Sequence, residues 1–578
     1  MGEARSLDRS QMMVRIGISL GQGALLWWLY DRVDHDLWPK DQMGWLVALV
    51  AAAVLVPGAH YLIADLPQPR RQLQVLAGLA LLALGLGWHH GAWGADEPYD
   101  APIAFAVPLA VLVFHALPFV QSVLTRGFVR PRYENLFQFA WRNALLIALG
   151  CVFAGVFWLL LALWGVLFQM LGVEFFRRLF TSSPFAIPAT TVAVGVGVQL
   201  AGSVERLQSA LRQQLLALLK WLTPLATLIL VLFTVTLVAK SPELFAEQRR
   251  AISAVWLLWL VAVTVALLNS AYQDGREDTP YPRWLGNVIR VAAVLLLPVA
   301  LLAVYALAIR LDRYGITVPR AWGLLVALIA LIYAGGYAWA SVRKGPWMGG
   351  IGAVNVAVAL ITIAMLTIML TPALSPERLA AASQYRRAVA DASEDAYAYL
   401  RFQSGRYGRE RLQRLARIEG LPNAEDIRAR ADRQLKRKER WDGAEPSAPL
   451  AADAFEVYPK GSRLDPKLLG VLQESEAGFH PGECDATSPC PVLFVDLNRD
   501  GSDEAIFFTD NRPAAATRKP GGGWRAIQIQ FQLPVGRPVP YQGKEAFASA
   551  LEQGRFRTVD LPWQAIEISG ATYVVTDP

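Results

Sequence analysis

Eleven apolar segments, each about as long as a membrane-spanning helix, follow one another through residues 1–372, and this succession constrains the fold more than any other feature. A helix needs roughly 20 mainly apolar residues to cross the hydrocarbon core of a bilayer. Residues 218–239 and 251–272 meet this requirement most clearly, whereas the first segment is interrupted by glycines. The sequence therefore predicts a multi-pass α-helical membrane domain over 1–372. The predicted spans are residues 13–31, 43–64, 73–92, 101–121, 143–171, 184–202, 218–239, 251–272, 286–310, 319–341 and 347–371.

The positions of lysine and arginine between these spans predict the orientation. Residues 91–100 contain neither, whereas residues 122–142 contain four arginines. Cytoplasmic loops of membrane proteins carry the excess of positive charge. We therefore expect a bacterial inner-membrane protein with a cytoplasmic N-terminus and, after eleven spans, a periplasmic tail. No small-residue cleavage site follows the first segment, so it is expected to remain as an uncleaved span.

Two of the three cysteines, Cys484 and Cys490, lie close together in the tail. A disulfide can close a loop of this length, and disulfides persist in oxidising compartments such as the periplasm. Two free thiols and a zinc site remain as alternatives, although neither a C-x-x-C pair nor a histidine cluster accompanies them. We favour the disulfide, with Cys151 reduced inside its apolar segment, and this supports a periplasmic tail.

Few ionisable side chains lie deep in the predicted spans. The candidates for an intramembrane polar site are His115, His60 and the adjacent pair His89 and His90. Ionisable residues within membrane helices are costly and usually functional. The simpler interpretation of His115, the most central, is a neutral ring bonded to a carbonyl of a neighbouring helix. Neither an acidic relay nor a ladder of arginines is present, which disfavours ion-coupled transport.

Aromatic residues and arginines alternate over residues 130–150, just before a predicted span. This composition is typical of an interfacial helix anchored on anionic headgroups. A lipid-substrate site is the alternative.

Three motifs together resemble a known family. They are YENLFQFAWRNALLIAL (133–149), LAIRLDRYGITVPRAWGLL (307–325) and YAYLRFQSGRYGRERLQRLA (397–416). In this order they are similar to the bacterial multipass inner-membrane family catalogued as domain of unknown function 4153. The resemblance implies an inner-membrane protein with a C-terminal extracytoplasmic domain, and it implies no established activity and no catalytic residue.

The composition changes after Pro372. Ser375-Pro376-Glu377 is a typical helix start, and residues 373–442 predict a juxtamembrane segment of two or three helices that ends in a basic run. Residues 443–453 predict a linker. Residues 454–578 predict a small α+β periplasmic domain, with strands near 492–497, 504–509, 524–533, 556–561 and 565–575 and helices near 465–474 and 544–552.

Oxygen-bearing residues alternate in the loop after the run 492–497. Such spacing around a glycine, here Gly501, provides the ligands that a hard cation such as Ca²⁺ prefers. The loop resembles the D-x-N-x-D-G-x-x-E loops of FG-GAP-type β repeats, but Phe507 replaces the bidentate glutamate of an EF-hand. A hairpin with an Asp-Gly turn and no metal is the alternative. The candidate calcium ligands are Asp496, Asn498, Asp500, Ser502 and Glu504.

Three classes of function remain open. We favour a cell-envelope protein whose periplasmic domain binds a protein partner, a ligand or a cation. The alternatives are a translocator of lipids or small solutes and a membrane-embedded enzyme acting on an envelope lipid. No recognised catalytic motif is present, which favours a non-enzyme, but a cluster of histidines or carboxylates facing the periplasm at membrane level would favour the enzyme. The net charge of +7 is spread over loops and indicates contact with the lipid bilayer, with no nucleic-acid partner.

Overall fold

In the computed structural model the chain forms two compact units, Met1–Lys438 and Glu439–Pro578. Asn498, residues 528–533 and 556–561, and most of the predicted linker 443–453 lie outside the residues that the structure describes. The described residues are 9–94, 100–127, 132–203, 205–246, 253–275, 280–344, 346–390, 394–437, 452–462, 464–474, 484, 489–497, 500–508, 513–519, 522–527, 544–554, 566–568 and 571–573.

Within these ranges, eleven helices of the first unit are long and apolar enough to cross a membrane, which confirms the predicted number of spans. A further short helix, α6 (Phe175–Thr181), follows the fifth. The eleven are α1 (Arg9–Asp34), α2 (Met43–Ile63), α3 (Pro69–Trp93), α4 (Asp100–Arg126), α5 (Tyr133–Met170), α7 (Ser183–Ser203), α8 (Glu205–Ala246), α9 (Ala254–Tyr272), α10 (Arg283–Tyr314), α11 (Val318–Val342) and α12 (Ile351–Leu370).

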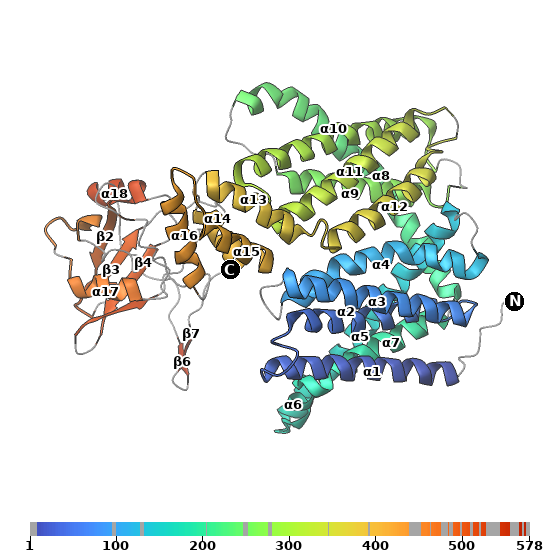
Figure 1. Ribbon diagram of the computed structural model, residues 1–578, viewed down its shortest axis with the longest axis horizontal. Coiled ribbons are helices and arrows are strands. Elements are labelled where there is room, and N and C mark those ends of the chain that lie inside the picture. The colour runs from blue at the N-terminus through green and yellow to red at the C-terminus, as the bar shows by residue number, and fades with distance from the viewer. Residues whose placement is uncertain are drawn as a thin grey trace. The chain divides into compact units, whose positions relative to one another are not determined.

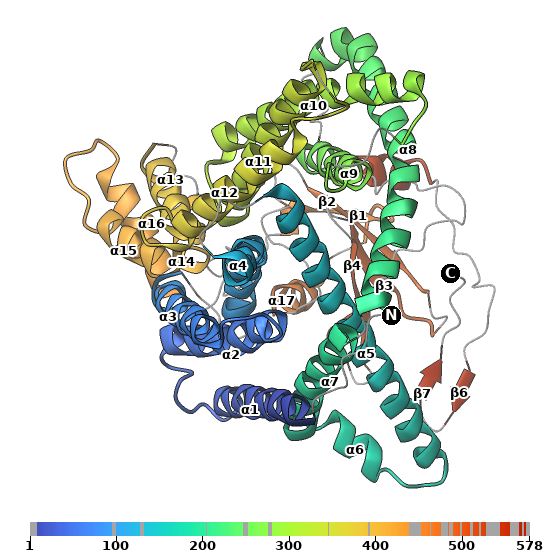
Figure 2. The same cartoon turned by 90° about the vertical axis from the view of Figure 1, so that its right-hand side faces the viewer.

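The membrane helices run side by side, and α4 lies between the pair α2–α3 and α12 (Figures 1 and 2). Helix pairs in a bilayer pack closely where small residues face each other. At Gly91 of α3, an added Cβ would collide with the carbonyl of Met43 in α2. This close approach fixes the last turn of α3, which carries two of the histidines noted above.

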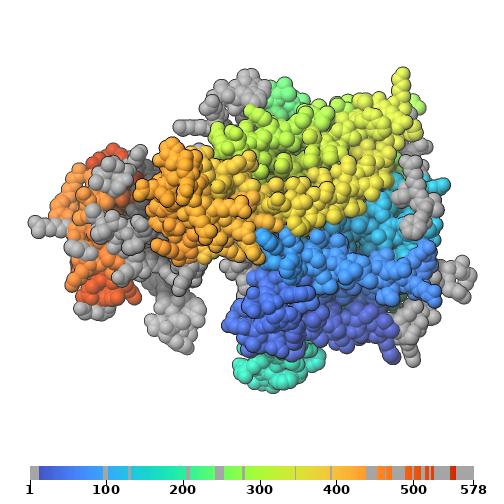
Figure 3. Space-filling view, in the orientation of Figure 1, coloured from blue at the N-terminus to red at the C-terminus, as the bar shows by residue number. Residues whose placement is uncertain are grey.

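Four short helices follow α12 and belong to the same compact unit, where two or three were predicted. We call α13–α16 the tail helices. Ser375 caps the first of them by accepting a hydrogen bond from the Arg378 backbone N–H (3.2 Å). The tail helices pack against the membrane helices at the end of the bundle opposite to the start of α1 (Figures 1 and 3). Their bounds are α13 (Pro376–Ala390), α14 (Glu394–Phe402), α15 (Gly405–Leu415) and α16 (Ala424–Lys436).

The described part of the segment 130–150, for which an interfacial helix is predicted, forms the first half of α5. Helix α5 runs without interruption from Tyr133 to Met170, because no proline breaks it between the aromatic segment and the apolar one. The polar residues of the segment bond to other helices: Asn143 pairs with Gln121 of α4, and Arg142 donates to the Leu62 carbonyl of α2 (3.0 Å).

The second unit contains a five-stranded sheet with the order β1-β2-β3-β4-β5, in which β1 pairs with β2 in parallel and the other pairs are antiparallel. Helix α17 packs near β5 and α18 against β2, and β6 and β7 form a separate pair. The predicted α+β class and both predicted helices are confirmed. The elements are β1 (Phe455–Tyr458), α17 (Pro466–Glu474), β2 (Cys490–Val495), β3 (Glu504–Phe508), β4 (Pro513–Arg518), β5 (Trp524–Ile527), α18 (Lys544–Glu552), β6 (Ile566–Ile568) and β7 (Ala571–Tyr573).

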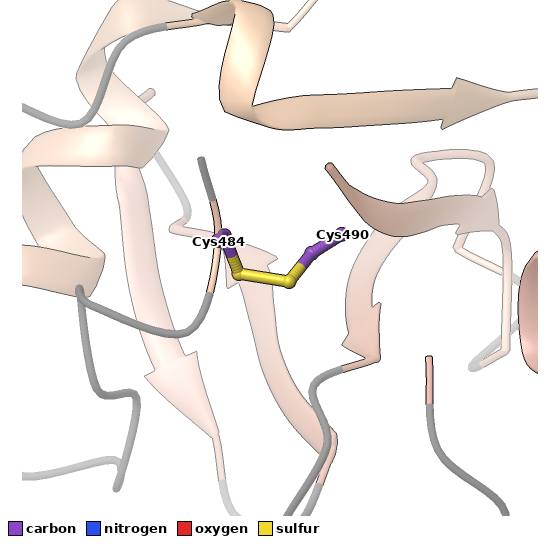
Figure 4. Close-up of a disulfide and its surroundings, with 2 residues drawn as sticks. All are labelled: Cys484 and Cys490. Atoms are coloured by element: carbon purple, nitrogen blue, oxygen red, sulfur yellow. A yellow bond between two sulfur atoms is a disulfide. The ribbon is translucent and has the colours of Figure 1, made fainter. Parts of the chain in front are cut away.

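The predicted disulfide between Cys484 and Cys490 is present (Figure 4). Both cysteines are buried in the hydrophobic core beside Phe455, Phe507 and Trp524. The bond therefore fixes the entry to β2 within the core. Cys151 is a free cysteine, as predicted, and it is exposed on the surface of α5.

Candidate functional site

The last turn of α3 places two adjacent histidines against the tail helices. Successive residues of a helix point about 100° apart, so the two rings meet different neighbours. The His89 Nε2 atom lies 3.2 Å from the Tyr407 hydroxyl of α15. The His90 Nδ1 atom lies 3.7 Å from Oε1 of Glu377 in α13. We call His89, His90, Glu377 and Tyr407 the tail-side cluster.

The imidazole and the carboxylate of this cluster are both removed from solvent. The side chains of His90 and Glu377 are 15% and 8% exposed, and the His90 ring stacks on Phe105 with 5.2 Å between centroids. Glu377 lies in the first turn of α13, where the helix dipole favours a negative charge. The distance of 3.7 Å exceeds that of a hydrogen bond, so a further polar atom can contact both groups.

A cavity of about 50 Å³ adjoins the tail-side cluster. It has room for roughly three water molecules and enough polar partners to bind them. Burial raises the pKa of the Tyr407 phenol, which therefore keeps its proton at neutral pH. The polar lining of the cavity consists of His89, His90, Ser375, Glu377 and Tyr407, and the apolar lining includes Phe105 of α4, Trp322 of α11 and Met369 of α12.

A glycine lets α15 approach the end of α3. Gly405 has a φ of +57°, in the left-handed region that favours glycine. A Cβ at this position would collide with the carbonyl of Trp93. The guanidinium of Arg406 then stacks over the Trp93 ring, 4.4 Å from its centroid. The SGRYG part of the third motif therefore places Tyr407 beside His89.

The loop between α10 and α11 is bound by side chains of α13 and α14. This loop belongs to the second motif, and Tyr399 of α14 belongs to the third. The tail helices are thus attached to the membrane helices through backbone groups, and the walls of the cavity are fixed. The contacts are Ile316 N–H to Ser383 Oγ (2.9 Å), Val318 N–H to Tyr399 Oη (2.7 Å), Gln384 Nε2 to Ile316 O (2.9 Å) and Arg387 Nη1 to Tyr314 O (2.7 Å).

Two other polar groups lie at the opposite end of the bundle. In the first, which we call the Tyr–Asn network, Tyr337 of α11 bonds to Asn269 of α9 (2.7 Å) and to Asn355 of α12 (2.8 Å). Asn355 donates in turn to Tyr133 of α5 (3.0 Å) and to Asn269 (2.7 Å). The network joins four helices, and Tyr337 is completely buried.

In the second group, Asp65 accepts from Arg15 of α1 and from Arg142 of α5, whose Nη2 lies 3.4 Å away. The Ser19 hydroxyl of α1 lies 2.7 Å from the Tyr61 hydroxyl of α2. These bonds hold α1, α2 and α5 together. The first of the three motifs supplies Tyr133 to one group and Arg142 to the other.

Residues 44–408 match the family model described as Domain of unknown function (DUF4153). The match covers more than half of the 578-residue chain. The chain belongs to the DUF4153 family. No curated protein and no solved structure matches it. The matched region ends within α15, so all four members of the tail-side cluster lie inside the DUF4153 domain.

Of the intramembrane residues predicted from the sequence, only His89 and His90 join the tail-side cluster. His115 bonds through Nδ1 to the Val111 carbonyl of its own helix (2.8 Å), whereas the simpler interpretation predicted a carbonyl of a neighbouring helix. His60 packs its ring edge-on against Tyr61. Among the described residues, neither of these two histidines hydrogen-bonds to the other.

The sequence did not indicate Glu377 or Tyr407 as site residues of the DUF4153 domain. Glu377 was recognised as part of a helix start, and Tyr407 as part of a motif. Their shared property, proximity to the end of α3, depends on how the tail helices pack. A residue pattern within either segment does not contain that information.

The predicted calcium loop connects β2 and β3 in the second unit. The Asp496 carboxylate accepts from the backbone N–H groups of Asp500 (3.2 Å) and Gly501 (3.0 Å). Glu504 is buried and accepts from the Thr517 hydroxyl (2.8 Å) and the Leu497 N–H (2.8 Å). The Ser502 N–H donates to Asp500, and Asn498 lies outside the described ranges. Within those ranges, no three acidic, histidine or cysteine side chains group as metal ligands. The calcium site stays a prediction.

Proposed function

We propose that this DUF4153 protein is a cell-envelope protein of the bacterial inner membrane that binds the polar end of an envelope lipid or a small polar ligand at the tail-side cluster. The cavity of about 50 Å³ carries this proposal. Two imidazoles, a carboxylate and a phenol can together donate to and accept from one bound group. Only the polar end of a ligand fits such a volume, so the rest of the ligand extends along the membrane edge.

The proposed orientation has a cytoplasmic N-terminus and extracytoplasmic tail helices. The buried disulfide of the second unit supports an oxidising compartment for the tail. Alkaline phosphatase fused after Arg437, beyond the last tail helix, is expected to be active. An inactive phosphatase together with an active cytoplasmic reporter at the same position would contradict this orientation.

Binding at the cluster is tested by native mass spectrometry of the full-length protein released from mild detergent. The wild type is expected to retain a lipid or small molecule, and Glu377→Gln is expected to lose it. Glu394→Gln is the matched control, because Glu394 pairs with Arg430 and Arg433 on the surface of the tail helices. Equal retention in both variants, or no retained species in the wild type, would contradict the proposed binding.

An enzyme is the second candidate, because a buried imidazole beside a carboxylate can transfer protons in general acid–base catalysis. The same experiment separates the two functions. A retained molecule with unchanged mass after prolonged incubation supports binding, whereas release of a hydrolysed or rearranged product supports catalysis on an envelope lipid.

The second unit is proposed to bind a protein partner or a cation in the same compartment. For the cation, Ca²⁺ at tenfold excess over its Kd would stabilise the unit by about 1.4 kcal/mol. Asp496→Ala with Asp500→Ala is expected to abolish that shift in the full-length protein. An unchanged unfolding midpoint of the wild type in millimolar Ca²⁺ would leave the loop as a metal-free connection between β2 and β3.

A further inference from the structure

Three arginines of the tail helices lie beside the tail-side cluster. Arg378 is in the first turn of α13, a few residues after the end of α12. Its Nη1 donates to the Pro372 carbonyl (2.9 Å), so its guanidinium turns back towards the end of the membrane helix. Leu374, in the same connection, has an exposed fraction of 45%. Arg378 therefore lies where a membrane-spanning helix meets the polar layer.

The other two arginines, Arg411 and Arg414, are on α15. They follow Tyr407 by four and seven residues, so all three lie along one face of the helix. The Arg411 Nη1 approaches the Tyr407 carbonyl (3.5 Å). Helix α15 packs against α13, the helix that carries Arg378.

In the part of the chain that the structure describes, none of these three side chains forms an ion pair with a carboxylate. The hydrogen bonds of Arg378 and Arg411 go to backbone carbonyls. The nearby Glu410 pairs with Arg406 (3.2 Å), and Glu377 faces His90. Burial, followed by the charges of Arg414 and Arg378, lowers the pKa of Arg411, while Glu410 acts in the opposite direction.

We propose that Arg378, Arg411 and Arg414 bind the phosphate group of an anionic lipid headgroup. Guanidinium groups present paired N–H donors that match phosphate oxygens, and a bound phosphate removes the mutual repulsion of the three cations. The position of Arg378 at the end of α12 favours a lipid over a dissolved ion. The inference rests on the proposed function for its location and names the chemical class of the ligand.

The test uses the full-length protein in a neutral detergent and two short-chain probes, dihexanoyl phosphatidylglycerol and dihexanoyl phosphatidylcholine. The anionic probe is expected to bind at least tenfold more tightly than the zwitterionic one. Arg378→Gln with Arg414→Gln is expected to remove that preference. Arg386→Gln with Arg428→Gln is the matched control, because it removes the same charge from exposed positions elsewhere on the tail helices.

Three results would overturn the proposal. The first is equal binding of the two probes, and the second is a control variant that weakens binding as much as Arg378→Gln with Arg414→Gln. The third is competition by inorganic phosphate as strong as that by the anionic lipid, because this would identify a dissolved anion as the ligand. If the wild type retains a phosphorus-free molecule and Glu377→Gln does not, the proposed function stands and the phosphate site is refuted. If Glu377→Gln keeps the preference for the anionic lipid, the phosphate site of the arginines is supported and the role of Glu377 in binding is refuted.

Discussion

The tail-side cluster and the Tyr–Asn network are buried polar groups at opposite ends of the membrane bundle, and they differ in the distances between their polar atoms. In the Tyr–Asn network every bond lies between 2.7 and 3.0 Å. In the tail-side cluster the distance between His90 and Glu377 is 3.7 Å and a cavity adjoins them.

The difference separates a structural role from a binding role. Buried polar groups that satisfy one another hold helices in place and leave no atom for a ligand. Polar groups that line a cavity can contact a ligand or water that enters it. We therefore propose a structural role for the Tyr–Asn network and a binding role for the tail-side cluster, and the following variants test that division.

Gly405→Ala is expected to have the largest effect. A left-handed conformation costs an alanine roughly 1–2 kcal/mol, and the collision of its Cβ with Trp93 adds roughly 1–3 kcal/mol. The tail helices should detach, and hydrogen exchange should rise in α13–α15 and the α10–α11 loop while the Tyr–Asn network stays protected. Gly420→Ala is the control, because Gly420 has a φ of +78° but no atom near its Cβ position. Equal exchange in both variants would show that packing on Trp93 does not hold the tail helices.

Asn355→Leu is expected to destabilise the membrane helices by about 2 kcal/mol. The variant removes three interhelical hydrogen bonds, and such bonds contribute about 0.6 kcal/mol each in membrane proteins. Unfolding by sodium dodecyl sulfate, followed by circular dichroism, measures the change. Thr367→Val is the control on the same helix, because among the described residues the Thr367 hydroxyl donates only to the Ile363 carbonyl of its own helix. If Asn355→Leu loses no more stability than Thr367→Val, the proposed structural role of the network is refuted.

Glu377→Gln is expected to change stability by less than about 1 kcal/mol, because the amide keeps the volume of the side chain and can still form hydrogen bonds, and because the 3.7 Å between Glu377 and His90 is too long for a hydrogen bond that the variant would lose. The same variant should lose the retained ligand. Glu377→Gln should thus have a small effect on stability and a large effect on binding. The opposite is expected for Asn355→Leu. A loss of stability as large as that of Asn355→Leu would assign the tail-side cluster to structure.

The smallest effect is expected in the second unit, where Asp465 is fully paired. It accepts from the Trp524 indole N–H (3.0 Å) and from the Lys467 N–H (2.9 Å), and the first bond, then the second, lowers its pKa. A carboxyl with a lowered pKa stabilises the fold above its ordinary pKa, and this contribution is lost as the pH falls through the folded-state value. The stability of the second unit is measured by urea titration at pH 5 and below pH 3.8, with hydrogen exchange in α17 and β5 as the readout. The free energies of unfolding of wild type and Asp465→Asn should differ at pH 5 and become equal at the lower pH. A constant difference between them would exclude this linkage.

Much of the fold was predictable because its signals are local. Apolar runs of helical length predicted eleven spans, the spacing of Cys484 and Cys490 predicted the disulfide, and the helices near 465–474 and 544–552 were both predicted. Strands β1 and β4 were missed. Strand β4 is rich in alanine and starts with Pro513, and both are poor strand signals, so its pairing with β3 and β5 determines its conformation.

The candidate site was only half predictable. His89 and His90 were noticed because ionisable residues are rare in apolar segments. Asn269, Tyr337 and Asn355 gave no comparable signal, since neutral polar residues are ordinary in membrane helices. Glu377 and Tyr407 acquire their roles from the packing of α13 and α15 on α3, which brings together residues far apart in the sequence.

The attachment of the α10–α11 loop to the tail helices has a consequence for the order of biogenesis. The backbone groups of Ile316 and Val318 bind side chains, those of Ser383 and Tyr399, that are synthesised only after α11 and α12. During translation, both membrane helices must therefore be inserted before this loop finds its partners. The DUF4153 domain is completed by its own last residues, and a nascent chain released before α13 would lack the side chains that bind the loop and that close the cavity beside both histidines.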